Sequence, residues 1–509
     1  MDENKKYLGK KEIWLYSVAA LGQGMMYAIM SGYITDFYLQ VLHLGLPFVL
    51  ILTFVSRFWD AVNDPIVGSI VDRHTTKWGK FKPYVAFSAI PISVLTFLMF
   101  CDWGGALDIR LHPEIATFTM VYAAVTYVLW DMAYTVGDVP FWSLPNVMTP
   151  NPDERGQLFS LSRTINSIGS AIPTVLFGIL FVFAGKLGIR SDGTKYAIIV
   201  TFVSVVGLSL YMISCFAVKE RVLIPNLPKE KKDPNEPSVL RRLLQCRPLM
   251  LVVTMGILAS GRYLMGAASV HVARYAFFVG KITEGMTADQ ISAEVSKSIG
   301  TVNTILTGCS AVGMFGTMLV LPYLYKKYDY KKIVVIACFA GFFSSIITTV
   351  FGAISIAKDI GWMFFLCIPF LIIQCVPLGV LNVTSYAMVG DCLDYLEWKT
   401  GYRDNALGSA CQTFVNKLSN ALATGFVIIM YMIIGLDPKN TMADSAVKLV
   451  TELSHVQRIG MFSLVSIVPG LSMIVCAIPV FFYDISGEKK KRITAELAQM
   501  RQAKGITIE

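Results

Sequence analysis

The chain has 509 residues, of which 54% are hydrophobic and only 16% are charged. A soluble domain does not tolerate this balance, so the composition predicts an all-α polytopic membrane protein. The formal net charge of +9 would suit an anionic macromolecule, but no basic patch interleaved with aromatic residues is present, and we expect no nucleic-acid partner. The ten cysteines form no CxxC pair or His/Cys cluster, so we expect neither disulfides nor a cysteine-bound metal.

Hydropathy divides the chain into about twelve apolar segments, each long enough to cross a bilayer core of roughly 30 Å. The polar first dozen residues have no apolar core or cleavage site, which argues against a cleavable signal peptide. The predicted spans are 13–40, 45–71, 83–103, 115–144, 158–185, 196–218, 249–280, 297–325, 333–356, 361–390, 407–435 and 459–484.

A polar stretch rich in proline and mixed charge separates the first six spans from the last six. It predicts a linker at 219–248 between an N-terminal six-helix lobe (1–218) and a C-terminal six-helix lobe (249–486), with a tail at 487–509. Basic loops follow both the second and the eighth span, as expected for a transporter built from related repeats.

Lysine and arginine gather in alternate loops and at both ends of the chain. The positive-inside rule then places both termini in the cytoplasm. We therefore expect a multi-pass protein of the cytoplasmic membrane, and the positive charge is a signal of orientation.

The second span carries ionisable side chains in the middle of an apolar segment. Arg57, Asp60 and Asp64 follow i, i+3 and i+7, so they share one helical face with Asn63 at its edge. An aspartate at the centre of a span costs roughly 2.5–3.5 kcal/mol on insertion scales. Two carboxylates on one face need a counter-cation, a proton or water, which is typical of a cation-coupled transporter. The alternative is a pair of acids solvated at a helix end.

The fourth span carries four polar or aromatic residues at i, i+4, i+7 and i+11, and therefore on one face: Asp131, Thr135, Asp138 and Trp142. Together with the second span, the N-terminal lobe holds four carboxylates against two embedded arginines. That excess is stable only if acids are protonated or a cation binds. Asp131 alternatively pairs with an arginine for assembly, and Trp142 is either an interfacial belt residue or a stacking surface for a sugar ring.

Charged loop residues suggest a gate that closes one side. Trp78–Pro83 form a glycine-bearing basic turn, which serves as an orientation anchor and as a gate contact. An acidic segment follows the tenth span, although an ordinary solvated loop would also explain it. The candidate gate residues are Arg73, Lys80, Lys82, Asp391, Asp394 and Glu397.

Lys417 lies inside the eleventh span, with Gln412 and Thr413 one turn before it. A lone intramembrane lysine usually pairs with an acid or a ligand. The seventh span carries Arg262 and Arg274, but a spacing of 12 separates them by about three turns, so at most one lies at midplane depth. We assign neither arginine a direct ligand role.

Several of these segments together resemble the glycoside–pentoside–hexuronide cation symporters, a branch of the major facilitator superfamily typified by melibiose permease. The resemblance covers roughly residues 15–485, and the motifs are specific only in combination. They are RFWDAVNDP (57–65), WGKFKP (78–83), TYVLWDMAYTVGDVPFWSL (126–144), Arg163, VGDCLDYLEW (389–398) and CQTFVNK (411–417). The resemblance implies the fold of that superfamily, with twelve helices in two lobes that rock around a midplane site.

The resemblance also implies roles for individual residues. The cation-binding positions are Asp60, Asn63, Asp64 and Thr135, where Asp60 and Asp64 would be the charged ligands of sodium in a sodium-coupled protein. The positions around the sugar are Asp138, Trp142, Arg163, Gln412, Thr413 and Lys417.

Three positions depart from the family pattern. Gly24 stands where the permease has an aspartate that grips sugar hydroxyls, and Asn382 stands where it has a tryptophan lining the pocket. Asp131 replaces a glycine one turn from Thr135, which adds an acid to the cation site. Loss of the first-span acid argues against melibiose itself, and we expect the room left by Gly24 to suit a bulkier glycoside or a negatively charged uronide.

We therefore predict symport of a sugar, glycoside or uronide coupled to sodium or protons, with no cofactor and no obligate protein partner. One alternative is a transporter of the same fold that moves a lipid, steroid or aglycone. A more distant one is an intramembrane enzyme, because Asp60-x3-Asp64 superficially resembles the aspartate-rich motifs of membrane prenyltransferases.

Overall fold

The computed structural model shows a helical protein whose chain forms two compact units. It describes residues 7–73, 76–149, 152–221, 246–281, 283, 285–325, 327–400, 405–436 and 453–503. The first unit comprises residues 1–230, 278–304 and 435–453, and the second comprises 231–277, 305–434 and 454–509. Helix α10 (Ala288–Tyr325) belongs in part to each. Most of the predicted linker lies outside the described residues, so the predicted lobe boundaries stay predictions.

Eleven helices in the described part of the chain are long and apolar enough to cross a membrane. A further apolar stretch, Leu46–Ser56, opens another helix. The helices lie where hydropathy placed the spans: the segment predicted at 13–40 forms Lys10–Gln40, and that at 196–218 forms Asp192–Ala217. The predicted all-α membrane fold is therefore confirmed.

The first unit is built around α1, which packs against α5 and α6. Helix α3 packs against α4 and α6, and α2 packs against α4. Prolines inside three of these helices do not end them, because neighbouring helices can satisfy the freed backbone groups. The helices are α1 (Lys10–Gln40), α2 (Leu46–Arg73), α3 (Lys82–Met99), α4 (Ala116–Met148), α5 (Pro152–Phe183) and α6 (Asp192–Ala217).

The second unit contains several interrupted helices. A 3-10 segment, η3 (Ala259–Tyr263), separates α8 (Arg247–Leu258) from α9 (Leu264–Tyr275). Similar breaks divide two other spans into shorter helices. The remaining elements are α11 (Tyr330–Ala357), η4 (Gly361–Cys367), α12 (Ile368–Gln374), α13 (Val376–Thr400), α14 (Asn405–Ile433), α17 (His455–Ser463), α18 (Ile467–Phe482) and α19 (Gly487–Ala503).

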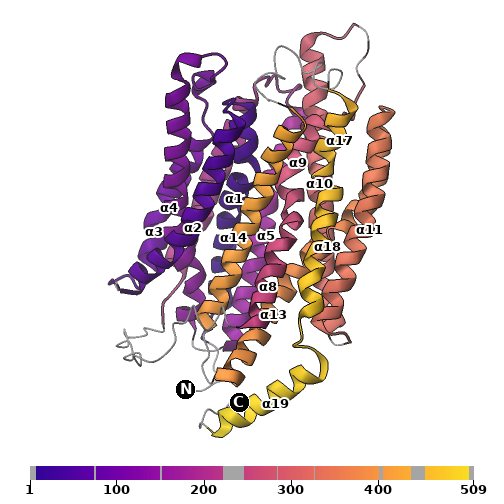
Figure 1. Ribbon diagram of the computed structural model, residues 1–509. Coiled ribbons are helices and arrows are strands. Elements are labelled where there is room, and N and C mark those ends of the chain that lie inside the picture. The colour runs from indigo at the N-terminus through magenta and orange to yellow at the C-terminus, as the bar shows by residue number, and fades with distance from the viewer. Residues whose placement is uncertain are drawn as a thin grey trace. The chain divides into compact units, whose positions relative to one another are not determined.

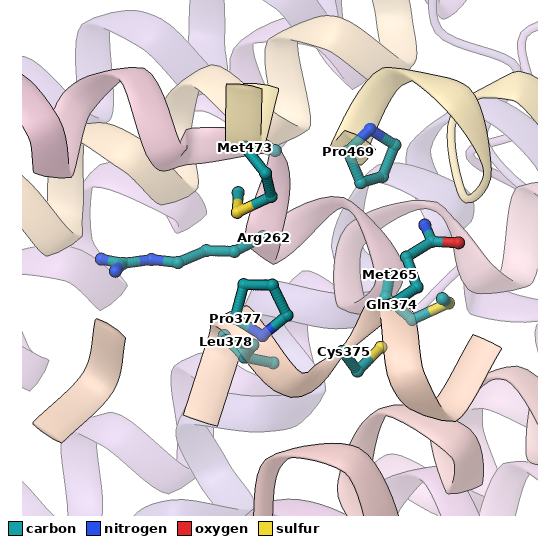
Figure 2. Close-up of a pocket in the computed structure, with 9 residues that line it drawn as sticks. Arg262, Met265, Gln374, Cys375, Pro377, Leu378, Pro469 and Met473 are labelled. Carbon is teal, nitrogen blue, oxygen red and sulfur yellow. The ribbon is translucent and has the colours of Figure 1, made fainter. Parts of the chain in front are cut away.

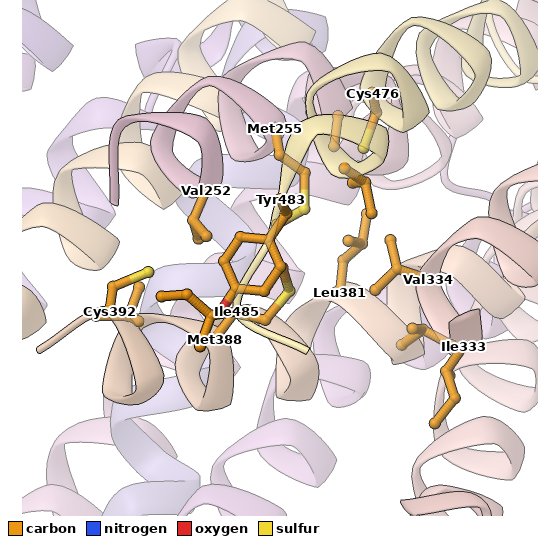
Figure 3. Packing of buried hydrophobic residues seen from close by; sticks show 14 of the residues in the cluster. Val252, Met255, Ile333, Val334, Leu381, Met388, Cys392, Cys476, Tyr483 and Ile485 are labelled. Atoms are coloured by element: carbon orange, nitrogen blue, oxygen red, sulfur yellow. The ribbon is translucent and has the colours of Figure 1, made fainter. Parts of the chain in front are cut away.

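Buried apolar side chains from α8, α11, α13 and α18 form the core of the second unit. Figure 3 shows Tyr483, just after α18, surrounded by residues such as Val252 and Met388. Ile493 and Leu497 of α19 are also buried, at 4% and 2% exposure. The tail helix therefore packs against the unit through an apolar face.

Helix α19 lies across the end of α13 (Figure 1), and polar contacts also hold the two helices together. The Trp398 indole N–H donates to Glu496 at 2.7 Å, and Lys490 pairs with Asp391 at 2.7 Å. The Arg492 guanidinium and the Trp398 indole hold the pKa of Glu496 below its usual range. Asp391, which was predicted to be a gate residue, is thus paired within its own unit.

The basic turn between α2 and α3 cradles a carboxylate. Gly79 has φ +116°, a backbone conformation that favours glycine. The backbone N–H groups of Lys80, Phe81 and Lys82 donate to Glu220 at 2.6, 3.0 and 2.9 Å. An anion at a helix N-terminus satisfies its free N–H groups. Glu220 therefore ties the chain after α6 to the start of α3.

We expect Gly79→Ala to break this cradle. An added Cβ would lie 2.5 Å from the Glu220 carboxyl carbon. The left-handed backbone costs about 1–2 kcal/mol for a residue with a side chain, and losing hydrogen bonds to a charged group costs about 1.5–3 kcal/mol more. The measurement is thermal unfolding of the detergent-solubilised protein.

Gly188→Ala is the matched control, because Gly188 has φ +69° but nothing within 4 Å of an added Cβ. It should carry the backbone strain alone and lower the melting temperature less. Equal effects of the two variants would contradict a cradle role for Gly79.

Candidate functional site

Asp138 belongs to an amide network where α1, α4 and α5 meet. Gln23 of α1, only 3% exposed, donates from Nε2 to Asp138 Oδ1 and to the Tyr134 hydroxyl, the latter at 2.9 Å. Asn166 of α5 donates to Gln23 Oε1 at 2.7 Å and to the carbonyl of Ala20 at 2.9 Å. These bonds occupy both donors of the Gln23 amide and hold the Asp138 carboxylate in place.

Gly24 marks a close approach of α1 to α5. A Cβ on Gly24 would lie 2.3 Å from the carbonyl oxygen of Asn166. The expectation that Gly24 leaves extra room for a ligand is therefore wrong, because the backbone of α5 fills that space. In this chain the neighbouring Gln23, and not residue 24, presents its side chain to Asp138.

Trp142 and Arg163 stack on each other in the first unit. The guanidinium carbon of Arg163 lies 3.8 Å from the centroid of the Trp142 ring, a cation–π contact. Trp142 is half-buried, whereas Arg163 is exposed. Together with Asp138, which lies one turn before Trp142 on α4, they line one region of this unit. A sugar ring that stacked on this face of Trp142 would have to displace the guanidinium.

The predicted cation positions lie on two helices that pack together, α2 and α4. Asn63 on α2 is 5% exposed, and Asp131 and Thr135 on α4 are each 2% exposed. Asp64 is partly buried, and the Asn63 amide nitrogen has no hydrogen-bond partner among the described residues. The side chain of Asp60 lies outside the described part of the structure. Buried oxygen ligands on facing helices suit a hard monovalent cation or a proton.

The predicted site and gate residues of the second unit lie on α13, α14 and their surroundings. Asn382 on α13 donates to the Met314 sulfur at 3.6 Å, and Lys417 on α14 is partly buried. Asp394 and Glu397 follow Asp391 on α13 and are also partly buried. The side chains of Gln412, Thr413 and Arg73 lie outside the described residues.

Two groups of polar residues were not identified as site residues from the sequence. Gln23, Tyr134 and Asn166 surround Asp138, and their only sequence signal is an amide or hydroxyl within an apolar span. In the second unit, Arg262 Nη2 donates a hydrogen bond to Asn416 Oδ1 at 3.1 Å, although Arg262 was not expected to have a ligand role. Helical spacing within one span cannot find such pairs, because each joins residues of different helices.

Solved structures with a similar backbone are transporters of the major facilitator type. A D-xylose–proton symporter matches with a TM-score of 0.52 and 12% identity over 94% of this chain and 98% of its own. The POT family transporter PepTSo matches with a TM-score of 0.57 and 11% identity over 94% and 99% of the two chains. These likenesses show the fold of the chain, and its apolar helices indicate a multi-pass membrane protein.

Residues 15–487 match the family described as MFS/sugar transport protein, and the chain belongs to that family. It is 27% identical to an uncharacterized symporter, YjmB, of Bacillus subtilis, over 98% of this chain and 97% of that protein. It is 25% identical to a putative sulfoquinovose importer of Salmonella typhimurium, over 97% and 94%. It is 24% identical to the raffinose carrier protein of Pediococcus pentosaceus, over 99% and 73%.

These relatives confirm the predicted place among the glycoside–pentoside–hexuronide symporters. They also make the chain a transporter and not an intramembrane enzyme.

We expect Gly24→Ala to disturb the Asp138 network, because the added Cβ would lie 2.3 Å from the carbonyl oxygen and 3.0 Å from the side-chain nitrogen of Asn166. The new methyl group meets the α5 backbone, which cannot rotate away, so α1 and α5 must separate at a cost of about 1–3 kcal/mol. That separation lengthens the Gln23–Asn166 hydrogen bond. The melting temperature and the rate of substrate uptake should both fall.

Gly32→Ala provides the control on the same helix, because nothing lies within 4 Å of a Cβ at that position. It should behave like the unmodified protein. A fully stable and active Gly24→Ala protein would show that the close approach is unimportant.

Proposed function

We propose that this protein is a secondary active transporter that couples the movement of a sugar, glycoside or uronide to sodium or protons. The observation that best supports this proposal is the set of buried polar side chains on α2 and α4. A carboxylate in an apolar span is stable only with a proton or a cation close by. Asp60 and Asp64 would supply the charged ligands, and Asn63, Thr135 and Asp131 would supply further oxygens.

Asp138, Trp142 and Arg163 would bind the substrate in the first unit. A carboxylate and a guanidinium both make charge-assisted hydrogen bonds to hydroxyl groups, and an indole ring offers a stacking surface. Gln412, Thr413, Lys417 and Asn382 are the other proposed substrate positions. Relatives named as a raffinose carrier protein, a lactose permease and a putative sulfoquinovose importer support a carbohydrate class.

The protein would lie in the cytoplasmic membrane with both termini in the cytoplasm, as the distribution of Lys and Arg favours. Transport would proceed by alternating access. Arg73, Lys80 and Lys82 would meet Asp391, Asp394 and Glu397 when the cytoplasmic side closes. Asp391 would then exchange its present partner Lys490 for a residue of the basic turn.

We predict that Asp64→Asn abolishes accumulation of substrate against its gradient. The amide keeps the size of the side chain but removes the negative charge that would hold the cation. Uptake of labelled sugars, glycosides and uronides into membrane vesicles is the measurement, under a sodium gradient, a proton gradient or neither. Uptake by the variant should not exceed the level seen without a gradient, although the protein still reaches the membrane.

Asp289→Asn serves as the control, because Asp289 is an exposed acid that pairs with Arg190. It should accumulate substrate normally. Normal accumulation of substrate by the Asp64→Asn variant would contradict the proposed cation coupling. If the unmodified protein takes up no sugar under either gradient, a lipid, steroid or aglycone becomes the better substrate class.

A further inference from the structure

Arg262 is a buried cation in the middle of a span of the second unit. It lies 15 residues after Arg247 and 13 before Tyr275, within the span Arg247–Tyr275. It is only 5% exposed. A guanidinium at this depth is costly unless other groups satisfy its charge and its donors.

The described residues satisfy the guanidinium only in part. Nη2 donates to Asn416 Oδ1 at 3.1 Å, and the guanidinium lies 4.8 Å from the centroid of the Tyr263 ring. Nε and Nη1 are buried and have no hydrogen-bond acceptor among the described residues. The partners that Arg262 does have carry no negative charge, so its positive charge is not neutralised by them.

The Asn416 amide is oriented with its oxygen toward Arg262. Its oxygen also accepts from the Tyr263 hydroxyl at 3.4 Å, and its nitrogen donates to the Tyr386 hydroxyl at 3.1 Å. An amide with its nitrogen committed to Tyr386 keeps its oxygen toward the arginine. Lys417 is the next residue along α14, so a second cation lies close in the chain.

The described spans of the second unit offer Arg262 few acids. The described spans Arg247–Tyr275, Tyr330–Ala357, Phe414–Ile433 and His455–Phe482 contain no aspartate or glutamate. In the span Gly361–Lys399, the acids occur only within the last nine residues, from Asp391 onward. Asp391 is already bound to Lys490. In these described spans the acids are therefore confined to the end of α13, and none of the printed contacts of Arg262 is to one of them.

Helix breaks surround Arg262. It lies in η3, and the nearby breaks after Gln374 and before Ile467 interrupt two more spans. Gln374 Nε2 donates to the free carbonyls of Val465 and Ser466 at 2.8 and 3.1 Å. Discontinuous helices of this kind are typical of binding sites in transporters.

The small cavity at these breaks is too narrow to be the site itself. Its volume is about 10 Å³, which is about the space of one water molecule. Figure 2 shows the Arg262 side chain extending between Met473 and Pro377 and away from Gln374 and Met265. The cavity by itself therefore holds nothing larger than a water molecule.

We propose that Arg262, oriented by Asn416 and assisted by Lys417, binds an anionic group of the substrate, so that the cargo is an acidic sugar. This inference rests on the proposed sugar transport and narrows it to one class. A carboxylate or a sulfonate on the sugar would supply the acceptor oxygens and the negative charge that Arg262 lacks. A neutral hexose supplies no such charge.

The test compares binding of acidic sugars with that of their neutral counterparts to the purified full-length protein. The pairs are glucuronate with glucose and galacturonate with galactose, and a hexose carrying a 6-sulfonate tests the second acid. Calorimetric titration should show at least one acidic sugar that binds about 10-fold or more tightly than its neutral counterpart. Arg262→Gln should weaken binding of the acid by about 10- to 100-fold and leave binding of the neutral sugar unchanged.

Asn416→Asp tests the same inference with almost no change of shape. The new carboxylate would lie at the 3.1 Å contact with Arg262 and neutralise it internally, so the preference for the acid should again disappear. This variant keeps the inference testable even if Arg262→Gln does not fold, which size-exclusion chromatography reports. Arg190→Gln removes an exposed arginine and is the control that should keep the preference.

Three results would overturn the inference. The first is equal affinity for acidic and neutral sugars, with the neutral sugar still accumulated under a cation gradient; the proposed function then stands without it. The second is an acid preference that survives in both variants. The third is sulfate binding as tight as that of the sugar acid. If the folded protein binds neither acidic nor neutral sugars, the proposed function itself fails, and this inference fails with it.

Discussion

The cost of placing charge among apolar helices governs both units. Water is scarce at that depth, so each ionised side chain needs a partner that the protein or its ligand supplies. In the first unit, Tyr196 donates to the buried Asp36 at 2.6 Å, and Gln23 donates to Asp138. In the second unit, Asn416 accepts from Arg262. In each of these three hydrogen bonds the partner is neutral, so the bond positions the charged group without itself neutralising it.

Neutral partners suit a transporter better than fixed ion pairs would. An internal salt bridge would satisfy both charges and leave little for a ligand to gain on binding. A carboxylate held by an amide is positioned and still negative, and it therefore remains attractive to a cation or to sugar hydroxyls. The close approach of α1 and α5 at Gly24 contributes to this, because it brings the Asn166 amide within 2.7 Å of Gln23.

Much of the fold could be predicted from the sequence, because apolar length alone defines a membrane span. Helical spacing and the resemblance also placed Asp64, Asp131 and Thr135 among the candidate cation positions of the second and fourth spans, and the structure adds that α2 and α4 pack together. What could not be predicted are contacts between elements distant in the chain. The Glu220 cradle uses backbone N–H groups, which have no sequence signature. Gly24 was misinterpreted, because a missing side chain is open space only if no neighbouring backbone fills it.

The two units bury different ionisable groups within their spans. The described part of the first has Asp131 on α4, and that of the second has Arg262 in η3. Under the two proposals above, a cation binds among the acids of the first unit and an acidic sugar binds Arg262 of the second. Each ligand then removes a desolvation cost that opposes burial of the other's binding groups. Because a coupling free energy is reciprocal, the cation must tighten sugar binding by the same factor by which the sugar tightens cation binding. Under these proposals, charge neutralisation would couple the two ligands without any direct contact between them.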